Sequence, residues 1–231
     1  MKNVVVTGVP RPPIEQLDKL ASFGVATVHE ALGRTGYLGP ELRPIQRGAR
    51  IAGSVVTALV WPGDNLMIHA AVEQCAPGDV LVVAPTSPCT DGYFGELLAT
   101  SLAAHGVRGL VIDAGVRDTA ELREMGFPVW SRHVSAQGTV KATAGAVNVP
   151  VVIGGQTVHA GSVVLADDDG VLIFPARDLP HAIEAANARE AEEQATREAL
   201  AAGGLGLDRY NLRALLKNLG VEYVTYEEYH E

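Results

Sequence analysis

The sequence predicts an α/β protein with a parallel α/β layer, a set of antiparallel strands and a C-terminal helical arm. Residues 65–132 alternate helical and strand-like segments, which is typical of a parallel sheet. Residues 149–174 contain four strand-like segments joined by Gly and Asp turns, with no room for helices between them. Residues 179–202 form one long stretch rich in Ala and Glu, which favours a single helix.

The N-terminal part predicts two helices and a strand. Apolar residues recur at helical spacing in residues 14–24. Residues 25–33 predict a second helix, with Thr27 as its candidate N-cap. Residues 50–60 are β-branched and apolar, which indicates a strand.

The middle of the chain predicts the parallel layer. Helices are expected over residues 65–75, 96–105 and 119–125, and strands over residues 80–84, 108–113 and 129–132. The run 80–84 is apolar throughout, as expected for a strand that is buried on both faces of a sheet.

The C-terminal part predicts antiparallel strands followed by helices. Strands are expected over residues 149–153, 156–158, 162–166 and 170–174, helices over 179–202 and 210–219, and a strand-like piece over 221–224. The run Asp167-Asp168-Asp169-Gly170 predicts a β-turn, because it lacks the other EF-hand positions and a closing Glu.

We expect one catalytic domain over residues 1–178 and a helical arm over residues 179–231. The arm helix carries mostly Ala on its apolar face, which is too thin to be held by burial on its own domain. We therefore expect the arm to pack on a neighbouring subunit.

Composition argues against several classes of protein. Apolar residues make up 47% of the 231 residues, enough for a folded core, and the net charge of −9 argues against a nucleic-acid binder. Two cysteines, Cys75 and Cys89, cannot form a disulfide framework. The short apolar run at the start does not resemble a signal peptide, and no stretch approaches the ~20 apolar residues of a membrane helix. We expect a cytoplasmic protein.

The stretch from Cys89 to Asp118 carries the candidate chemistry. Gly92 and Gly95 predict a flexible turn before the helix at 96, and the first amides of that helix form an anion site. The buried strand at 110–112 delivers Asp113, Arg117 and Asp118 to the loop at its C-terminal end. Arg117 can bind a carboxylate with two hydrogen bonds, and an aspartate is a hard oxygen ligand for Mg²⁺ or Mn²⁺.

A structural explanation of the same residues stays open at this point. The glycines are then only turn residues, and Arg117 forms a surface ion pair. Asp118, which precedes Thr119, is then the N-cap of the helix over residues 119–125. Spacing alone does not decide between the two interpretations.

Several segments together resemble the RraA-like superfamily, and within it the 4-hydroxy-4-methyl-2-oxoglutarate/4-carboxy-4-hydroxy-2-oxoadipate aldolases. The resemblance is carried by residues 89–96, 115–118 and 166–171, and extends to residues 25–31, 62–65 and 72–75. It implies an RraA-like core of the ββα swivelling-domain type. The superfamily also contains non-enzymatic regulators of ribonuclease E, which lack the acidic metal ligand after the arginine. This chain has Arg117-Asp118 at that place, which favours the enzymes.

The resemblance implies a role for each site residue. Arg117 binds the carboxylate and keto oxygen of pyruvate, and Asp118 ligates Mg²⁺, Mn²⁺ or another divalent metal together with waters. The substrate carboxylate is received by the turn formed by Gly95, Glu96, Leu97 and Leu98.

Two acidic residues are implied as holders of the catalytic water. Glu96 contacts a water beside the metal, and Glu193 reaches the site from the long helix of a neighbouring subunit. Glu190 and Glu192 lie close enough in sequence to exchange places with Glu193, and a solvated helix face explains all three. The histidines show no HxxxH or HxH spacing, and nothing marks Lys141 as a Schiff-base lysine.

The implied activity is that of a class II pyruvate aldolase in bacterial breakdown of aromatic compounds. It cleaves 4-carboxy-4-hydroxy-2-oxoadipate to pyruvate and oxaloacetate, and 4-hydroxy-4-methyl-2-oxoglutarate to two pyruvates, with oxaloacetate decarboxylation as a side activity. The resemblance implies a homotrimer or homohexamer with shared sites. The alternatives are a dedicated oxaloacetate decarboxylase, an aldolase for another 2-oxo acid, and a regulator of the RraA type.

Overall fold

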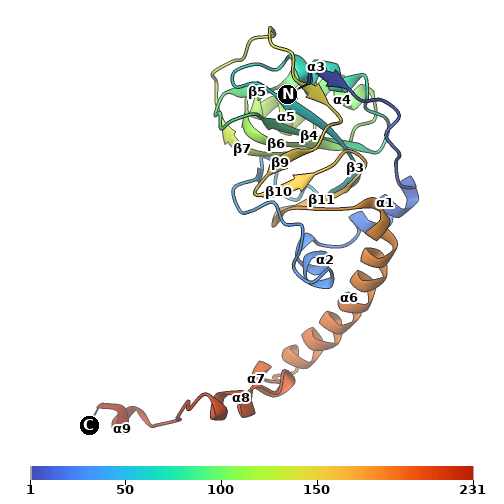
Figure 1. Ribbon diagram of the computed structural model, residues 1–231. Coiled ribbons are helices and arrows are strands. Elements are labelled where there is room, and N and C mark those ends of the chain that lie inside the picture. Colours follow the sequence, from blue (N-terminus) through green and yellow to red (C-terminus); the bar gives the residue numbers. More distant parts are fainter. Residues whose placement is uncertain (1, 231) are drawn as a thin grey trace. The chain divides into compact units, whose positions relative to one another are not determined.

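The computed structural model describes residues 2–230, and it divides into two compact units, Met1–Ala186 and Asn187–Glu231. The first unit is built on a ten-stranded mixed sheet and a separate pair of strands (Figure 1). The strands of the sheet are β1 (Val4–Val5), β2 (Arg43–Pro44), β3 (Ile51–Val60), β4 (Asp79–Pro85), β5 (Gly92–Phe94), β6 (Gly109–Val116), β7 (Val129–Val134), β8 (Ala146–Val147), β11 (Val163–Asp167) and β12 (Gly170–Phe174). The separate pair is β9 (Val151–Ile153) and β10 (Gln156–Val158).

The sheet confirms the predicted parallel layer. Its path runs β1-β8-β3-β4-β6-β7-β2, and the four central strands β3, β4, β6 and β7 are parallel. Strand β5 pairs with β6 in the same direction, although the sequence predicted only a turn there. Strands β11 and β12 form the predicted antiparallel hairpin, which pairs with β3 through β11 and turns at Asp167–Gly170.

The helices of the first unit lie where the sequence predicts them, with shorter ends. They are α1 (Ile14–Ala21), α2 (Val25–Ala31), α3 (Leu66–Val72), α4 (Glu96–Ala104), α5 (Thr119–Glu124) and the first turns of α6 (Leu179–Ala201). The predicted cap of α2 is wrong, because Gly24 holds the N-cap position and Thr27 lies inside the helix. The amide of Val25 instead donates to Asp167 Oδ2 at 2.9 Å.

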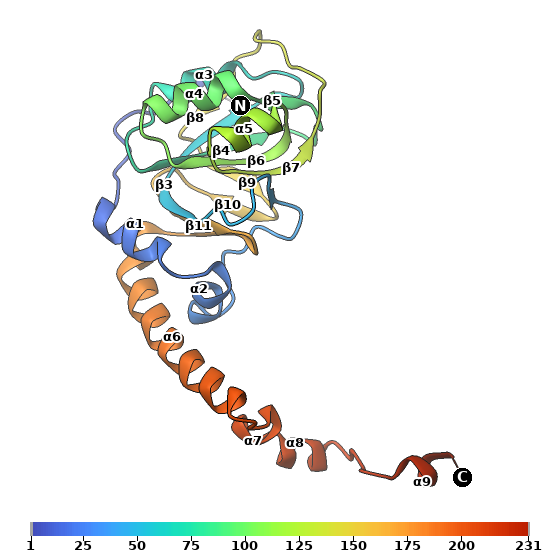
Figure 2. The ribbon, with the colours of Figure 1, turned by 180° about the vertical axis from the view of Figure 1, so that it is seen from behind.

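Side chains of the central strands alternate between two cores. Helices α3, α4 and α5 cover one face of the sheet, as Figure 2 shows from behind, and Leu81 and Ile112 point into this core. Val82 and Val111, which neighbour them in sequence, point into the core on the other face, against β9 to β12. Both faces are therefore buried, which explains the continuous apolar runs of these strands.

A third core joins α1, α2 and the start of α6 to the β11–β12 hairpin. Leu179, Ala182 and Ala186 are buried in it, with relative exposures of 0%. The expectation that the long helix is too thinly apolar to pack on its own domain is therefore wrong for its first two turns. Small side chains suffice there because they let the helix approach the hairpin closely.

The second unit contains the rest of α6, α7 (Gly206–Arg209), α8 (Leu212–Asn218) and α9 (Tyr226–His230). The predicted strand-like piece at 221–224 is not a strand, because it has no partner strand in the described chain. Large apolar side chains of this unit are exposed, among them Leu205, Leu215, Leu219, Tyr223 and Tyr226. Within residues 2–230, no helix combines the length and apolar character needed to cross a membrane.

Candidate active site

Arg117 and Asp118 follow directly after the end of β6. The strand runs three residues beyond the predicted end at 113, to Val116, so that Asp113 lies inside it. The Asp113 carboxylate pairs with Arg132 of β7 at 2.5 Å. The expectation that Asp113 reaches the same loop as Arg117 and Asp118 is therefore wrong. Because the strand is longer than predicted, Asp113 stays inside it and pairs with an arginine of the neighbouring strand.

Asp118 lies in a backbone conformation that side chains other than glycine rarely adopt, with φ 52° and ψ 42°. It occupies the N-cap position of α5, as the structural interpretation predicted, but its side chain makes no capping hydrogen bond there. Its Oδ2 atom instead accepts a hydrogen bond from the Glu96 amide, at the start of α4, at 3.2 Å. Such strained residues cost on the order of 1–3 kcal/mol and gather at functional sites, which indicates a role beyond capping.

The glycines of this stretch are required by close contacts rather than by turn flexibility, which corrects the predicted flexible turn. Gly95 has extended backbone that any residue adopts, but a Cβ atom there would lie 2.2 Å from Asp118 Oδ2. Gly92 is buried in β5, and a Cβ atom there would lie 2.4 Å from the Ser135 carbonyl oxygen. A side chain at either position would push away an element that shapes the site.

The Arg117 guanidinium lies beside Asp118. Its Nε atom is 3.7 Å from Asp118 Oδ2, and the two side chains are 49% and 40% exposed. The Arg117 amide donates to the Phe94 carbonyl at 2.8 Å, which fixes the backbone against β5. A Cβ atom at Gly138 would lie 3.0 Å from Arg117 Nη1, so that this glycine borders the guanidinium. Sequence reasoning missed Gly138, because its proximity to Arg117 arises only from folding.

The start of α4 contributes the other predicted site residues. The Glu96 side chain accepts a hydrogen bond from the Thr100 hydroxyl at 2.8 Å. Leu97 is 80% exposed, whereas Leu98 is buried in the core under the helix. The first amides of a helix have no acceptor within it, so those of residues 96–98 are available to Asp118 and to an anionic ligand.

Glu193 belongs to the second unit, whereas Gly95, Arg117 and Asp118 belong to the first. Its Oε1 atom is 3.0 Å from Arg189 Nε, one helical turn earlier in α6. It is half-buried, whereas Glu190 and Glu192 are exposed. Within the first unit, the structure therefore brings together Gly95 to Leu98, Arg117 and Asp118. Within the second unit, Glu193 pairs with an arginine of its own helix.

The donors at this site suit a divalent metal that keeps most of its waters. Among residues 2–230, no three His, Cys, Asp or Glu side chains gather as a metal-binding group. Asp118 supplies one hard carboxylate, and the missing side chain of Gly95 leaves room next to it. Mg²⁺ is commonly held by one or two carboxylates with several waters, so a single aspartate fits such an ion.

A separate cavity of about 870 Å³ lies at the carboxyl ends of β4, β6 and β7. It is lined by Asp91, Asp113, Arg132 and His133 among others, but not by Gly95, Glu96, Arg117 or Asp118. Its arginine is already paired with Asp113, whereas Arg117 lies beside both an aspartate and a helix start. The chemistry therefore favours Arg117 and Asp118 over this cavity as the active site.

The profile of the RraA-like family, described as Aldolase/RraA, matches residues 25–173. The chain belongs to the RraA-like family.

Proteins whose names indicate different functions are similar to this chain. A Thermus thermophilus protein named 4-hydroxy-4-methyl-2-oxoglutarate aldolase is 35% identical over 127 residues, covering 55% of this chain and 77% of its own. A Burkholderia multivorans protein, assigned that name provisionally, is 36% identical over 156 residues, covering 66% and 94%. The structure of RraAS2 from Streptomyces coelicolor, an unusual member of the RNase ES inhibitor RraA family, has a TM-score of 0.73 at 28% identity, covering 81% and 98%.

Proposed function

We propose that this chain is a divalent-metal-dependent aldolase for 4-hydroxy-2-oxo acids, with 4-carboxy-4-hydroxy-2-oxoadipate and 4-hydroxy-4-methyl-2-oxoglutarate as substrates. The observation that carries the proposal is Asp118, held by the Glu96 amide with its carboxylate beside Arg117. The aldolase names of the relatives support a carbon–carbon lyase. An aspartate directly after the arginine is the residue that the regulators of ribonuclease E lack.

The reaction requires a place for negative charge. A base removes the proton of the C4 hydroxyl, the C3–C4 bond breaks, and its electron pair forms an enolate with the charge on the keto oxygen at C2. Protonation at C3 then yields pyruvate. The Arg117 guanidinium stabilises this charge by charge-assisted hydrogen bonds, and the amides at the start of α4 bind the carboxylate next to it. When bound at Asp118, Mg²⁺ or Mn²⁺ supplies Lewis acidity to the same oxygen.

Glu96 and Glu193 hold the water that accepts the hydroxyl proton in this proposal. Glu96 lies at the start of α4, and Glu193 is contributed by a neighbouring subunit of a trimer or of a hexamer of two trimers. The exposed leucines and tyrosines of the second unit support assembly, because large apolar side chains are usually covered by a partner. Oxaloacetate decarboxylation passes through the same enolate and is expected as a side activity.

Pyruvate release from 4-carboxy-4-hydroxy-2-oxoadipate, with and without EDTA, tests the function. We expect release that EDTA abolishes and Mg²⁺ or Mn²⁺ restores, and we expect Asp118→Ala to lose this activity with little change in melting temperature. If the Asp118→Ala variant folds and turns over substrate normally, Asp118 has only a structural role, namely to accept the hydrogen bond from the Glu96 amide. Decarboxylation of oxaloacetate without aldol cleavage would favour the decarboxylase, and inactivity on both would favour a regulator.

Glu193 is tested by substitution and by dilution. Glu193→Ala should lower kcat about 100-fold, the scale of a lost proton-transfer group, while pyruvate binding measured by calorimetry stays near that of the unaltered protein. Glu190→Ala is the matched control and should leave kcat unchanged, because Glu190 lies exposed on the same helix. Dilution should reduce kcat in step with dissociation, and a fully active monomer by light scattering would contradict the shared site.

A further inference from the structure

The segment between β7 and β8, residues 135–145, forms a wall beside the Arg117 side chain. The Gly92 amide donates to the Gln137 carbonyl in this loop at 2.7 Å. The next residue, Gly138, approaches the guanidinium so closely that a Cβ atom there would lie 3.0 Å from Arg117 Nη1. The direction of the guanidinium therefore depends on where this loop lies.

Asp64 holds the far end of the 135–145 loop. Its Oδ2 atom accepts hydrogen bonds from the amides of Ala142 at 2.8 Å and Thr143 at 2.7 Å. Its Oδ1 atom accepts the Leu66 amide at 2.9 Å, at the first residue of α3. One carboxylate thus ties the loop to the connection between β3 and α3.

The Asp64 carboxylate is buried, with 3% of the residue exposed. Burial by itself raises the pKa of this carboxyl group, and the hydrogen bonds from Leu66, Ala142 and Thr143 lower it by more, so that the pKa is below its usual range. The side chain is therefore ionised at neutral pH. An ionised carboxylate is the form that can accept all three amides.

Backbone hydrogen bonds continue this attachment. The Val140 amide donates to the Gly63 carbonyl at 2.9 Å, and the Asn65 amide donates to the Val140 carbonyl at 3.0 Å. The loop is thus attached on both sides of Gly138. Before it, residue 137 is bonded to β5, and after it, residues 140–143 are bonded to Asp64 and its neighbours. Without the bonds to Asp64, the part of the loop beside Arg117 would be attached mainly through its bond to β5.

We propose that Asp64 is a positioning residue for Arg117, acting through the 135–145 loop. The inference rests on the proposed function, in which Arg117 binds the carboxylate and keto oxygen of the substrate. Asp64 touches neither the substrate nor Arg117. It fixes the wall along which the guanidinium lies, and a displacement of about 1 Å at such a group can cost about 100-fold in rate.

Asp64→Asn tests the proposal, because the amide keeps the shape of the side chain but cannot accept three amide protons with its NH₂ group. We expect a 10- to 100-fold lower kcat/KM for 4-hydroxy-4-methyl-2-oxoglutarate, mainly through a higher KM. The Mg²⁺ concentration for half-maximal activity should stay unchanged, because Asp118 is held separately by the Glu96 amide. Hydrogen exchange at Ala142 and Thr143 should become faster.

The matched control is Asp168→Asn. Both oxygens of Asp168 lie 3.0 Å from the Gly48 amide, so it too accepts a backbone hydrogen bond between loops. It should leave kcat and KM unchanged. Asp64→Asn with faster exchange in the loop but unchanged kinetics would overturn the positioning role.

A second variant and a binding measurement keep the test independent of folding and of turnover. Gly138→Ala leaves Asp64 intact, places a methyl group against Arg117 and should raise KM in the same way.

Calorimetry with oxalate, a planar dianion shaped like the pyruvate enolate, should give a 10-fold or greater increase in Kd for Asp64→Asn. Unaltered oxalate binding in both variants would overturn the inference, as would failure of the unaltered protein to bind oxalate. Oxalate binding with this dependence on Asp64 but without pyruvate release would contradict the proposed function and leave the positioning role supported.

Discussion

Arg117→Ala is expected to lower kcat/KM for pyruvate release about 30- to 1,000-fold, with a fall in kcat and a rise in KM. The guanidinium interacts with the substrate carboxylate in the ground state and with the developing enolate charge in the transition state. A charge-assisted bidentate contact at a desolvated site contributes on the order of 2–4 kcal/mol. Steady-state kinetics at saturating Mg²⁺ measure both parameters.

The chain offers a close control for this substitution. Arg177 is followed by Asp178, and its Nε atom lies 3.8 Å from Asp178 Oδ1, much as Arg117 lies 3.7 Å from Asp118. Arg177→Ala removes a similar arginine beside an aspartate away from the site, and its kinetics should match those of the unaltered protein. Arg117→Lys should restore only part of the activity, because an ammonium group cannot form the planar pair of hydrogen bonds. Near-normal kinetics of Arg117→Ala would remove this residue from the site.

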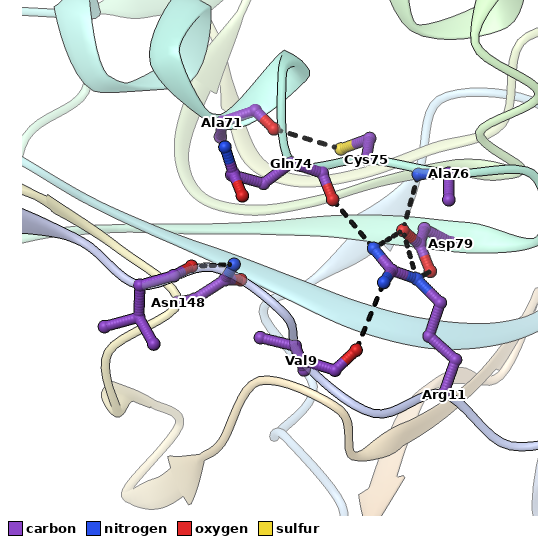
Figure 3. Close-up of polar contacts among 9 residues, drawn as sticks. Val9, Arg11, Ala71, Gln74, Cys75, Ala76, Asp79 and Asn148 are labelled. Carbon is purple, nitrogen blue, oxygen red and sulfur yellow. Dashed lines mark hydrogen bonds and ion pairs between the residues drawn. The ribbon is translucent and has the colours of Figure 1, made fainter.

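Arg11→Met should lower the free energy of unfolding by about 3–5 kcal/mol, a large fraction of the ~5–15 kcal/mol of a typical domain. Asp79 is fully buried, and Arg11 binds it through Nε at 2.9 Å and Nη2 at 2.8 Å (Figure 3). Arg11 also donates to the carbonyls of Gln74 and Val9, and Asp79 accepts the Ala76 amide at 2.7 Å. Removing the arginine leaves a buried charge without its cation, which costs more than the ion pair itself contributes.

Urea unfolding at one fixed protein concentration measures this effect. In the double variant Arg11→Met/Asp79→Asn, the loss should be smaller than the sum of the two single losses, because the unpaired charge is gone. Arg34→Met is the control: Arg34 pairs with Glu30 at 2.9 Å on an exposed helix surface, and its removal should change stability little. A loss below about 1 kcal/mol for Arg11→Met would show that water or another group replaces the arginine.

The Arg11–Asp79 pair also illustrates a limit of sequence reasoning. The two residues are 68 positions apart, and no motif joins them. The pair connects the segment after β1 to the start of β4, so it fixes the N-terminal segment across the end of the parallel layer. Only long-range pairing of strands, set by the whole core, brings such groups together.

The sequence by itself determined the order and type of the main elements. The apolar run at 80–84 and the alternation of helix and strand from 65 to 132 predicted the parallel layer, because a strand buried on both faces needs apolar residues on both. The four strand-like segments from 149 to 174, joined by short Gly and Asp turns, likewise predicted the antiparallel strands from local sequence alone. The two-residue strands β1, β2 and β8 were missed, because two residues are too few to show a pattern.

The tertiary structure alone decided how the site is assembled. From the sequence, Asp118 could be either a metal ligand or the cap of its own helix. Its hydrogen bond with the Glu96 amide forms because β5 pairs with β6, which brings the starts of α4 and α5 together. Gly92 and Gly95 were interpreted as turn residues, but contacts with Ser135 and Asp118 across the fold require them to lack side chains. Local patterns record propensity and burial, whereas contacts between distant residues depend on strand register and packing, which no short segment encodes.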